Sequence, residues 1–258
     1  MKTLKNYEEI QTEDGSTTLY SKAYGESCHS TSGARSETIL HYVKGCGIDQ
    51  ISNKTTPVNV LEVGFGVGIG FQETLEFTSK QNCFLNFISF EIDAELIEFV
   101  LEKLNIPFQK NEDCYQCQSK DFNLLIFYGN ARDKISKVPD YFNEKFYAIY
   151  QDAFSPKRNA ILWTTEWFKD LKNLAGPDCT LSTYSSSSSI RKSLIAAGWF
   201  VTKGDKFGPK RSSTRANLKG ITDLDILEHL KRSPAIEITD ENYDSYKLEG
   251  KNEKNLNL

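Results

Sequence analysis

The feature that most restricts the fold of this chain is a glycine-rich turn between a strand and a helix. Residues Val58–Val63 form a short apolar run of the kind that makes a buried strand. The run leads into Glu62-Val-Gly64-Phe-Gly66-Val-Gly68-Ile-Gly70, and helical spacing follows over 69–79. Glycine lets the backbone turn sharply and approach a ligand closely. The pattern therefore predicts a strand–turn–helix unit that opens a ligand site.

Strands alternate with helices along most of the chain. Further strands are predicted at 84–90, 124–128, 146–150, 180–184, 199–202 and 215–219. Further helices are predicted at 36–44, 94–104, 160–175 and 190–197. This alternation predicts an α/β protein with a mostly parallel, seven-stranded sheet and helices on both faces. Residues 108–121 are polar and are predicted to form a loop, and the serines at 185–189 are predicted to cap the next helix.

The length of 258 residues fits one large domain with flanking segments. Residues 1–50 are predicted to be an N-terminal cover of irregular or β-hairpin structure plus a helix. Residues 51–222 are predicted to form the core. Residues 223–258, where acidic residues outnumber basic ones, are predicted to form an acidic C-terminal tail.

Composition predicts a cytoplasmic protein with reduced thiols. No apolar run is long enough to span a membrane, and the N-terminus lacks the apolar core of a secretory signal. The six cysteines are spread along the chain without such a signal. Cys114 and Cys117 form a CxxC with no second cysteine or histidine pair at zinc-site spacing, so we expect two free thiols in a surface loop and no metal.

Polar residues at the strand ends indicate which ligand the turn binds, because ligands in parallel sheets lie outside the carboxyl ends of the strands. Glu91 ends the second strand, where a carboxylate can accept both ribose hydroxyls of a nucleoside. Asn130 and Ala131 follow the third, where an amide can contact adenine. The GxGxG spacing, with Glu62 two residues before the first glycine, favours S-adenosylmethionine. NAD and glycines that serve packing alone are the alternatives, and the absence of a following Lys-Ser/Thr excludes a P-loop.

The fourth strand ends in Tyr150-Gln-Asp-Ala-Phe-Ser-Pro156, where methyl-transfer chemistry is expected. Asp152 can hold an amine by its N–H and help to remove its proton, and Phe154 can stack on a planar base. The alternative is that Asp152 caps the next helix, with Pro156 in its first turn.

A basic segment near the C-terminus indicates an RNA contact. Eight basic residues and one acidic residue lie between Arg191 and Lys219, together with Trp199 and Phe207. Such a stretch suits a phosphate backbone with exposed bases, although a solvated face is the alternative. The net charge of −4 does not exclude this partner, because acidic residues elsewhere offset the segment.

These motifs resemble the methyltransferase domain of the bifunctional bacterial MnmC family, which finishes 5-methylaminomethyl-2-thiouridine at the tRNA wobble position. The resemblance runs from about Leu19 to Gly220. It rests on the glycine turn and on Cys28-His-Ser-Thr-Ser-Gly-Ala-Arg-Ser-Glu37, Phe87-Ile-Ser-Phe-Glu91, Tyr128-Gly-Asn-Ala-Arg132, Asp152-Ala-Phe-Ser-Pro-Lys-Arg-Asn159 with Trp163, and Phe207-Gly-Pro-Lys-Arg211. The chain departs from the family at Ala160, often proline, and at Asn130, often aspartate.

The resemblance implies a class I methyltransferase-like (Rossmann-like) fold, S-adenosylmethionine as co-substrate and Asp152 as the catalytic residue. The predicted cofactor contacts are Glu62, Gly64, Phe65, Gly66, Gly68, Glu91, Asn130 and Ala131. The predicted substrate contacts are His29, Ser30, Phe154, Lys157, Trp163, Phe207, Lys210 and Arg211. His29 is placed on either the cofactor or the base side.

The resemblance also implies that the partner is tRNA and the acceptor is the amine of 5-aminomethyl-(2-thio)uridine. About 38 residues follow Gly220, too few for a flavin-binding oxidase domain, so we expect no flavin and a reaction that starts from the aminomethyl form. We also expect a monomer. The alternatives are a methyltransferase for a small-molecule amine or a protein, and a non-catalytic S-adenosylmethionine-binding module.

Overall fold

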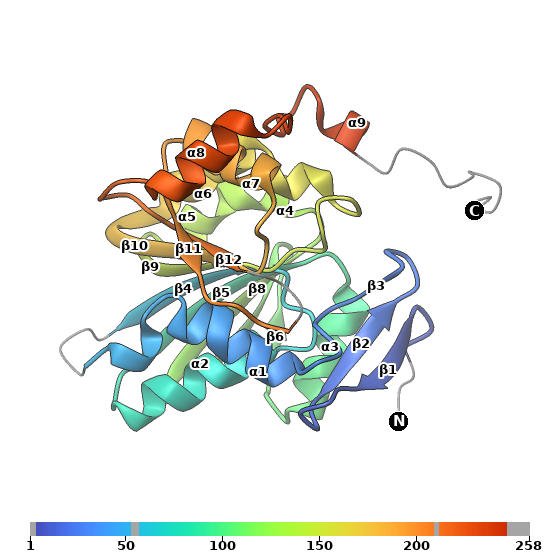
Figure 1. Ribbon diagram of the computed structural model, residues 1–258. Coiled ribbons are helices and arrows are strands. Elements are labelled where there is room, and N and C mark those ends of the chain that lie inside the picture. Colours follow the sequence, from blue (N-terminus) through green and yellow to red (C-terminus); the bar gives the residue numbers. More distant parts are fainter. Residues whose placement is uncertain (1–3, 53–56, 209–211, 247–258) are drawn as a thin grey trace.

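The chain folds around one large sheet, with a small three-stranded sheet beside it (Figure 1). The structure is a computed structural model and describes residues 4–52, 57–208 and 212–246. Among these residues the large sheet has nine strands, in the spatial order β11 (Phe200–Gly204), β12 (Ser213–Asn217), β10 (Ala175–Thr183), β9 (Phe146–Gln151), β4 (Val58–Val63), β5 (Leu85–Glu91), β8 (Phe122–Tyr128), β7 (Cys114–Gln118) and β6 (Gln109–Lys110). The α/β class is confirmed, and the predicted number of seven strands is corrected to nine.

Five neighbouring strands, from β10 to β8, run parallel and form the centre of the sheet. The chain moves from β4 outward through β5 to β8, and then returns to the other side of β4 for β9 and β10. This reversal at β4 creates the switch point at which open α/β sheets bind ligands. β12 runs antiparallel to both β10 and β11.

The two additional strands correct the prediction of a loop at 108–121. β7 pairs antiparallel with β8, and β6 pairs antiparallel with β7 at the sheet edge. Cys114, Tyr115 and Cys117 are buried within β7, so the CxxC thiols do not lie in a surface loop. The polar composition misled the prediction because an edge strand exposes its backbone and part of its side chains to water.

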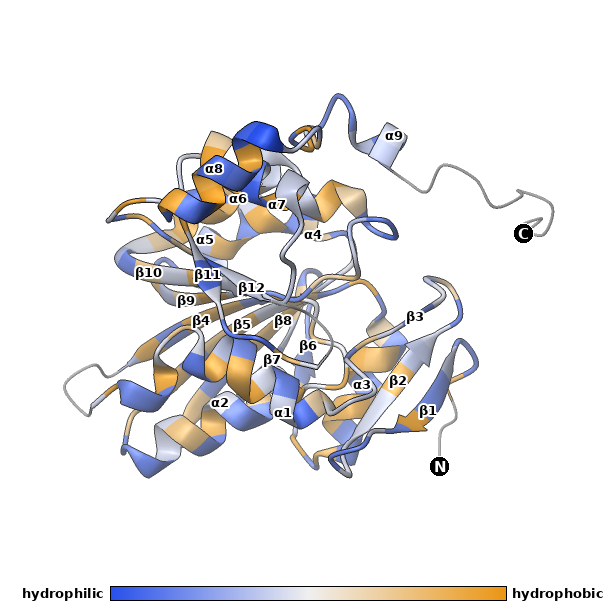
Figure 2. Ribbon diagram, in the orientation of Figure 1, coloured by the Kyte–Doolittle hydropathy of each residue, from blue (hydrophilic) through white to orange (hydrophobic). Residues whose placement is uncertain are grey.

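One face of the sheet is covered by the first half of the chain. Its helices are α1 (Ala34–Thr38), the π-helix η1 (Ile39–Lys44), the 3-10 helix η2 (Ile48–Gln50), α2 (Ile69–Lys80) and α3 (Ala94–Lys103). Their inward side chains form one apolar cluster with residues of the central strands. Figure 2 shows apolar residues concentrated in the central strands and on helix surfaces that face them.

The opposite face is covered by helices from the second half (Figure 1). They are α4 (Ala131–Lys134), η4 (Ile135–Lys137), α5 (Val138–Tyr141), η5 (Ala160–Trp163), α6 (Thr165–Leu174), α7 (Ser188–Ala196) and α8 (Leu224–Arg232), followed by the single turn α9 (Tyr243–Tyr246). The serine run does not cap α7 by a side chain, because Ser187 at the N-cap makes no side-chain capping hydrogen bond. No helix within the described ranges is long and apolar enough to cross a membrane.

The segment after residue 223 has more regular structure than the predicted acidic tail. Ile226 and Leu230 of α8 are buried, and Ile238 beyond the helix is fully buried in the same apolar cluster. The N–H of Ile238 donates to the hydroxyl of Ser193 on α7, which ties this segment to the core. Acidic residues on the solvent side of α8 hide this apolar spacing in the composition.

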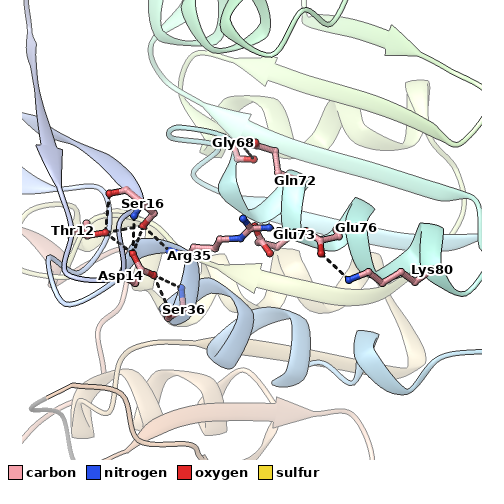
Figure 3. A network of polar contacts seen from close by, with 10 residues as sticks. All are labelled: Thr12, Asp14, Ser16, Arg35, Ser36, Gly68, Gln72, Glu73, Glu76 and Lys80. Atoms are coloured by element: carbon pink, nitrogen blue, oxygen red, sulfur yellow. Dashed lines mark hydrogen bonds and ion pairs between the residues drawn. The ribbon is translucent and has the colours of Figure 1, made fainter.

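The N-terminal cover contains the predicted hairpin, formed by β1 (Tyr7–Gln11), β2 (Thr17–Ser21) and the short β3 (Glu26–Ser27). Asp14 lies in its first turn, where its carboxylate accepts hydrogen bonds from Thr12, Ser16 and Ser36 (Figure 3). Desolvation opposes their effect, yet these bonds together lower the pKa of Asp14. Because Ser36 belongs to α1, the turn is fixed to that helix.

A second polar contact joins α1 to α2 (Figure 3). The guanidinium of Arg35 pairs with Glu73 at 2.5 Å and with Glu76 at 2.6 Å, and both carboxylates belong to α2. Together with the Asp14 contacts, these two ion pairs tie α1 to both the hairpin turn and α2.

Candidate active site

A cavity of about 220 Å³ lies at the carboxyl ends of the parallel strands, where the sequence predicts the ligand site. Residues at or just after the carboxyl ends of β4, β5, β8 and β9 form one side of it. They include Gly64, Gly66, Glu91, Asn130, Ala131 and Asp152. The N-terminal cover closes the other side with Tyr7, Tyr24, Cys28 and His29.

The glycine turn brings the backbone of β4 against the strand that carries Asp152. Gly64 has a φ of +99°, and a Cβ at this position would lie 2.8 Å from the carbonyl oxygen of Asp152. Both the left-handed conformation and the close approach therefore require glycine here. The N–H of Asp152 donates to Val63, so the ends of β4 and β9 stay adjacent at the cavity.

Glu91 ends β5 with a buried carboxylate that faces the cavity. Its two oxygens accept backbone hydrogen bonds, one from Gly66 at 2.9 Å and the other from Asp93 at 3.1 Å. Burial raises the pKa of Glu91, and these two hydrogen bonds oppose that rise. The carboxylate is thereby held at the strand end, where the sequence predicts contact with ribose hydroxyls.

Three predicted cofactor contacts lie outside the cavity lining, namely Glu62, Phe65 and Gly68. The carboxylate of Glu62 turns into the core, where it accepts a hydrogen bond from Ser89 at 2.9 Å. It also approaches Gly70, where a Cβ would lie 1.9 Å from its Oε1 atom. Burial, with a smaller effect of Asp152, raises the pKa of Glu62 well above its usual value. Glu62 therefore packs β4 against α2 instead of facing the cavity.

Asp152 places a carboxylate at the cavity. Its orientation is fixed by Tyr42, a residue that the sequence did not predict to belong to the site. The hydroxyl of Tyr42 donates to Oδ1 of Asp152 at 2.5 Å. Burial, and then the nearby Asp152 carboxylate, raise the pKa of Tyr42 well above its usual value, so the phenol stays a proton donor. Tyr42 lies in the π-helix, 110 residues before Asp152, and no spacing in the sequence links the two.

Buried groups also hold the loop that follows Asp152. The indole of Trp163 donates to the carbonyl of Phe154 at 2.9 Å, and the hydroxyl of Tyr184 donates to that of Ala153 at 3.0 Å. Trp163 is a predicted substrate contact, but it is fully buried and does not line the cavity. Its hydrogen bond to Phe154 holds the loop on the core side.

Two aromatic rings stack at the cavity. Tyr24 of the cover and Phe154 of the loop have ring centroids 4.3 Å apart and planes only 18° from parallel. Both line the cavity, and stacking of Phe154 on a planar base stays a prediction. Tyr24 comes from the turn between β2 and β3.

His29 lies opposite Asp152 and is almost fully buried. Its Nε2 atom is 4.0 Å from Oδ2 of Asp152, and its Nδ1 atom is 3.0 Å from the hydroxyl of Thr18 on β2. Burial lowers the pKa of His29 to about 4, so the ring is neutral at pH 7.

The remaining predicted substrate contacts do not gather at the cavity. Ser30 donates its N–H to the buried Glu37, and Phe207 packs edge-on against His41 with centroids 6.0 Å apart. Lys157 is exposed on the loop after Asp152. Lys210 and Arg211 lie outside the described residues.

The predicted basic docking face is not an uncompensated patch. Three of its cations form ion pairs within the protein, which are Lys203 with Asp225, Arg215 with Asp205 and Lys219 with Asp178. Arg191 is buried and donates to Thr214 and Ser213, and Lys192 donates to the carbonyl of Ala235. Asp205 lies within the counted segment, but Asp225 and Asp178 lie outside it, so the charge count did not include these two partners.

Taken together, the strand order, the glycine turn after β4 and the acidic residue at the end of β5 define a class I methyltransferase. The cradle at Gly64 and the buried carboxylate of Glu91 fit a nucleoside ligand such as S-adenosyl-L-methionine. A family described as S-adenosyl-L-methionine-dependent methyltransferases matches residues 92–219.

Comparison with individual proteins identifies the family more closely. The crystal structure of MnmC2 from Aquifex aeolicus is 32% identical, covers 92% of this chain and 80% of its own, and superposes with a TM-score of 0.77. The chain therefore belongs to the MnmC2 family of S-adenosyl-L-methionine-dependent methyltransferases.

Two relatives known by sequence match most of this chain. A tRNA 5-methylaminomethyl-2-thiouridine biosynthesis bifunctional protein MnmC from Azoarcus sp. is 28% identical over 81% of this chain and 35% of its own length. Protein MJ0670 of Methanocaldococcus jannaschii is 28% identical over 80% of this chain and 58% of its own. The chain thus spans about a third and somewhat over half of these two relatives.

Proposed function

We propose that this protein methylates the wobble uridine of tRNA. It transfers a methyl group from S-adenosylmethionine to the amine of 5-aminomethyl-(2-thio)uridine, giving 5-methylaminomethyl-(2-thio)uridine. The observation that carries this proposal is the Asp152 carboxylate, held by Tyr42 in the cavity beside the glycine turn. The similarity to MnmC2 and the name of the Azoarcus protein support tRNA as the partner.

Five residues would hold the co-substrate, namely Gly64, Gly66, Glu91, Asn130 and Ala131. S-adenosylmethionine supplies a methyl group on a positively charged sulfur. Glu91 would accept the ribose hydroxyls with lone pairs beyond those used by the two backbone N–H groups. Asn130 caps α4 through its Oδ1 atom, which accepts the N–H of Arg132 at 3.0 Å, so its amide is held at the cavity.

The acceptor nitrogen must be neutral, with its lone pair directed at the methyl carbon. Asp152 would hold an N–H of the amine and so orient the nitrogen, and positioning of this kind supplies much of the acceleration. As the N–C bond forms, the C–S bond breaks and sulfur keeps its electron pair. The nitrogen then loses one proton, which passes through Asp152 to water.

The target uracil and the phosphates that flank its nucleotide would contact residues around the cavity. A flipped-out uracil would extend the stack of Tyr24 and Phe154, because recognition of single-stranded RNA uses aromatic faces. Lys157 and Arg158 are exposed on the same loop and would contact the flanking phosphates.

The test is methyl transfer from labelled S-adenosylmethionine to tRNA that carries either the aminomethyl or the carboxymethylaminomethyl wobble nucleoside. We expect transfer to the aminomethyl tRNA, weakening steeply with salt because phosphate contacts release counterions. Transfer only to the carboxymethylaminomethyl form, or equal transfer to a free amine without tRNA, would refute the proposal. An Asp152→Ala variant should bind S-adenosylhomocysteine but lose transfer, and unchanged turnover would remove Asp152 from the mechanism.

A further inference from the structure

The cavity places two hydrogen-bonding atoms at a separation that suits one nitrogen between them. Oδ2 of Asp152 and Nε2 of His29 are 4.0 Å apart, too far for a direct hydrogen bond. A nitrogen about 2.9 Å from each atom would bond both, because that is the usual N–H···O distance. Both residues line the cavity, and their side chains are 13% and 6% exposed, so water screens such a contact little.

Each of the two atoms is oriented by a partner behind it. Tyr42 donates to Oδ1 of Asp152, and Oδ2 is the oxygen nearest to Nε2 of His29. Thr18 lies 3.0 Å from Nδ1 of His29 and is fully buried. If Nδ1–H donates to the Thr18 hydroxyl, Nε2 of the neutral ring carries a lone pair and is an acceptor. Burial lowers the pKa of His29 to about 4, which keeps that lone pair available at pH 7.

We propose that His29 and Asp152 together select a neutral primary amine and limit the reaction to one methylation. One N–H donates to Oδ2 of Asp152 and the other to Nε2 of His29, so the nitrogen lone pair faces the methyl donor. This inference rests on the proposed function and assigns the acceptor contacts of the same site. The bonds made and broken are those of the methyl transfer described above.

The product explains the limit to one methyl group. A secondary amine has one N–H, so it cannot donate to both acceptors and also direct its lone pair at a second methyl group. With its one N–H on Asp152, it would leave Nε2 of His29 without a donor, and sites that read an N–H reject the analogue that lacks it. The same argument disfavours the carboxymethylaminomethyl nucleoside, which is also a secondary amine and adds a carboxylate near Asp152.

The test compares wild type, His29→Leu and His29→Gln on tRNA bearing the aminomethyl or the methylaminomethyl nucleoside, with products identified by mass. Wild type should prefer the primary amine by at least about tenfold in kcat/KM. His29→Leu should lower the primary-amine value by roughly 10- to 100-fold and leave the secondary-amine value unchanged, so that the preference disappears. His29→Gln should keep part of it, because its amide oxygen can accept an N–H.

One control and one further variant accompany this comparison. His229→Gln removes a histidine on α8, far along the chain, whose ring contacts Ser188, and should match wild type. Thr18→Val removes the hydroxyl behind Nδ1 with little change of shape, and should reduce the preference even if His29→Leu fails to fold. Affinity for S-adenosylhomocysteine should stay within about threefold in each variant.

Three outcomes would contradict the account, and they differ. If His29→Leu and Thr18→Val both keep the wild-type preference for the primary amine, the inference is wrong but the proposed function is not affected. If His29→Leu loses tenfold in S-adenosylhomocysteine affinity but keeps the preference for the primary amine, His29 is a cofactor contact, and the inference is again wrong. Absence of transfer by wild type to both tRNAs would refute the proposed function, and the inference with it.

Discussion

Replacing Tyr42 by Phe tests whether the hydroxyl behind Asp152 positions the carboxylate that we propose to be catalytic. The change deletes one buried oxygen and the 2.5 Å hydrogen bond to Oδ1. Hydrogen bonds to charged groups contribute about 1.5–3 kcal/mol. If the whole amount stabilises the transition state, a tenfold change per 1.36 kcal/mol gives a loss of roughly 10- to 150-fold in kcat. The ring itself should stay in place, because it packs against Tyr150 with centroids 5.2 Å apart.

Single-turnover methyl transfer with saturating tRNA measures this loss, and calorimetry with S-adenosylhomocysteine measures cofactor affinity. We expect kcat to fall while KM for tRNA and cofactor affinity stay within about threefold, since Tyr42 does not line the cavity. Trp163→Phe, which loses the bond to Phe154 behind the same loop, provides a comparison for general loosening. A Tyr42→Phe enzyme with wild-type kcat, or equal losses in kcat and cofactor affinity, would refute the positioning role.

Three further predictions concern other parts of the site. Gly64→Ala should weaken S-adenosylhomocysteine binding at least about tenfold in calorimetry, because its Cβ would lie 2.8 Å from Asp152 at a φ of +99°. Burial lowers the pKa of His29 from 6.5 to about 4. Between these two pH values the unfolded state therefore binds one proton that the folded state does not. The free energy of unfolding should be highest above pH 6.5 and fall by roughly 3 kcal/mol as the pH is lowered to 4. Urea unfolding of His29→Gln should show a weaker dependence of this free energy on pH. Replacing Lys157 and Arg158 together by Ala should raise KM for tRNA. It should also reduce the slope of log affinity for tRNA against log salt concentration by about one to two.

Each of these predictions has a matched control. Gly220→Ala has a φ of +116° with open space around the new Cβ, so it should lose stability without loss of cofactor affinity. Equal losses in both glycine variants would contradict the role of Gly64. A His29→Gln enzyme with the wild-type pH dependence would show that His29 does not carry that stability change. Lys203→Ala removes a cation paired with Asp225, and a rise in KM as large as that from the loop variant would contradict the loop contact.

Most of the fold follows from local pattern in the sequence. The central strands carry apolar runs that end at glycine or at a carboxylate, and the helices between them have apolar stripes of the right period. The sequence predicts that Glu91 and Asp152 meet at the ligand site, because parallel strands bring their carboxyl ends to one edge of the sheet. The domain limits at 50 and 222 remain predictions, and α8 shows that the second flank packs onto the core.

The sequence could not show which contacts join distant segments. Tyr42 reaches Asp152 through the packing of a π-helix against β9, and the direction of the Glu62 carboxylate depends on Gly70 and Ser89 across the sheet. The charge count of the basic segment has the same limit, because it does not reveal that Lys219 pairs with Asp178. Side-chain direction and long-range pairing are properties of tertiary packing.

The most direct test of the account is mass analysis of wobble nucleosides in host cells that lack this protein. We predict that 5-aminomethyluridine derivatives accumulate, that 5-methylaminomethyl forms disappear, and that the wild-type gene restores them while Asp152→Ala does not. Normal levels of 5-methylaminomethyl nucleosides in those cells would contradict the central claim that this cavity methylates the wobble amine.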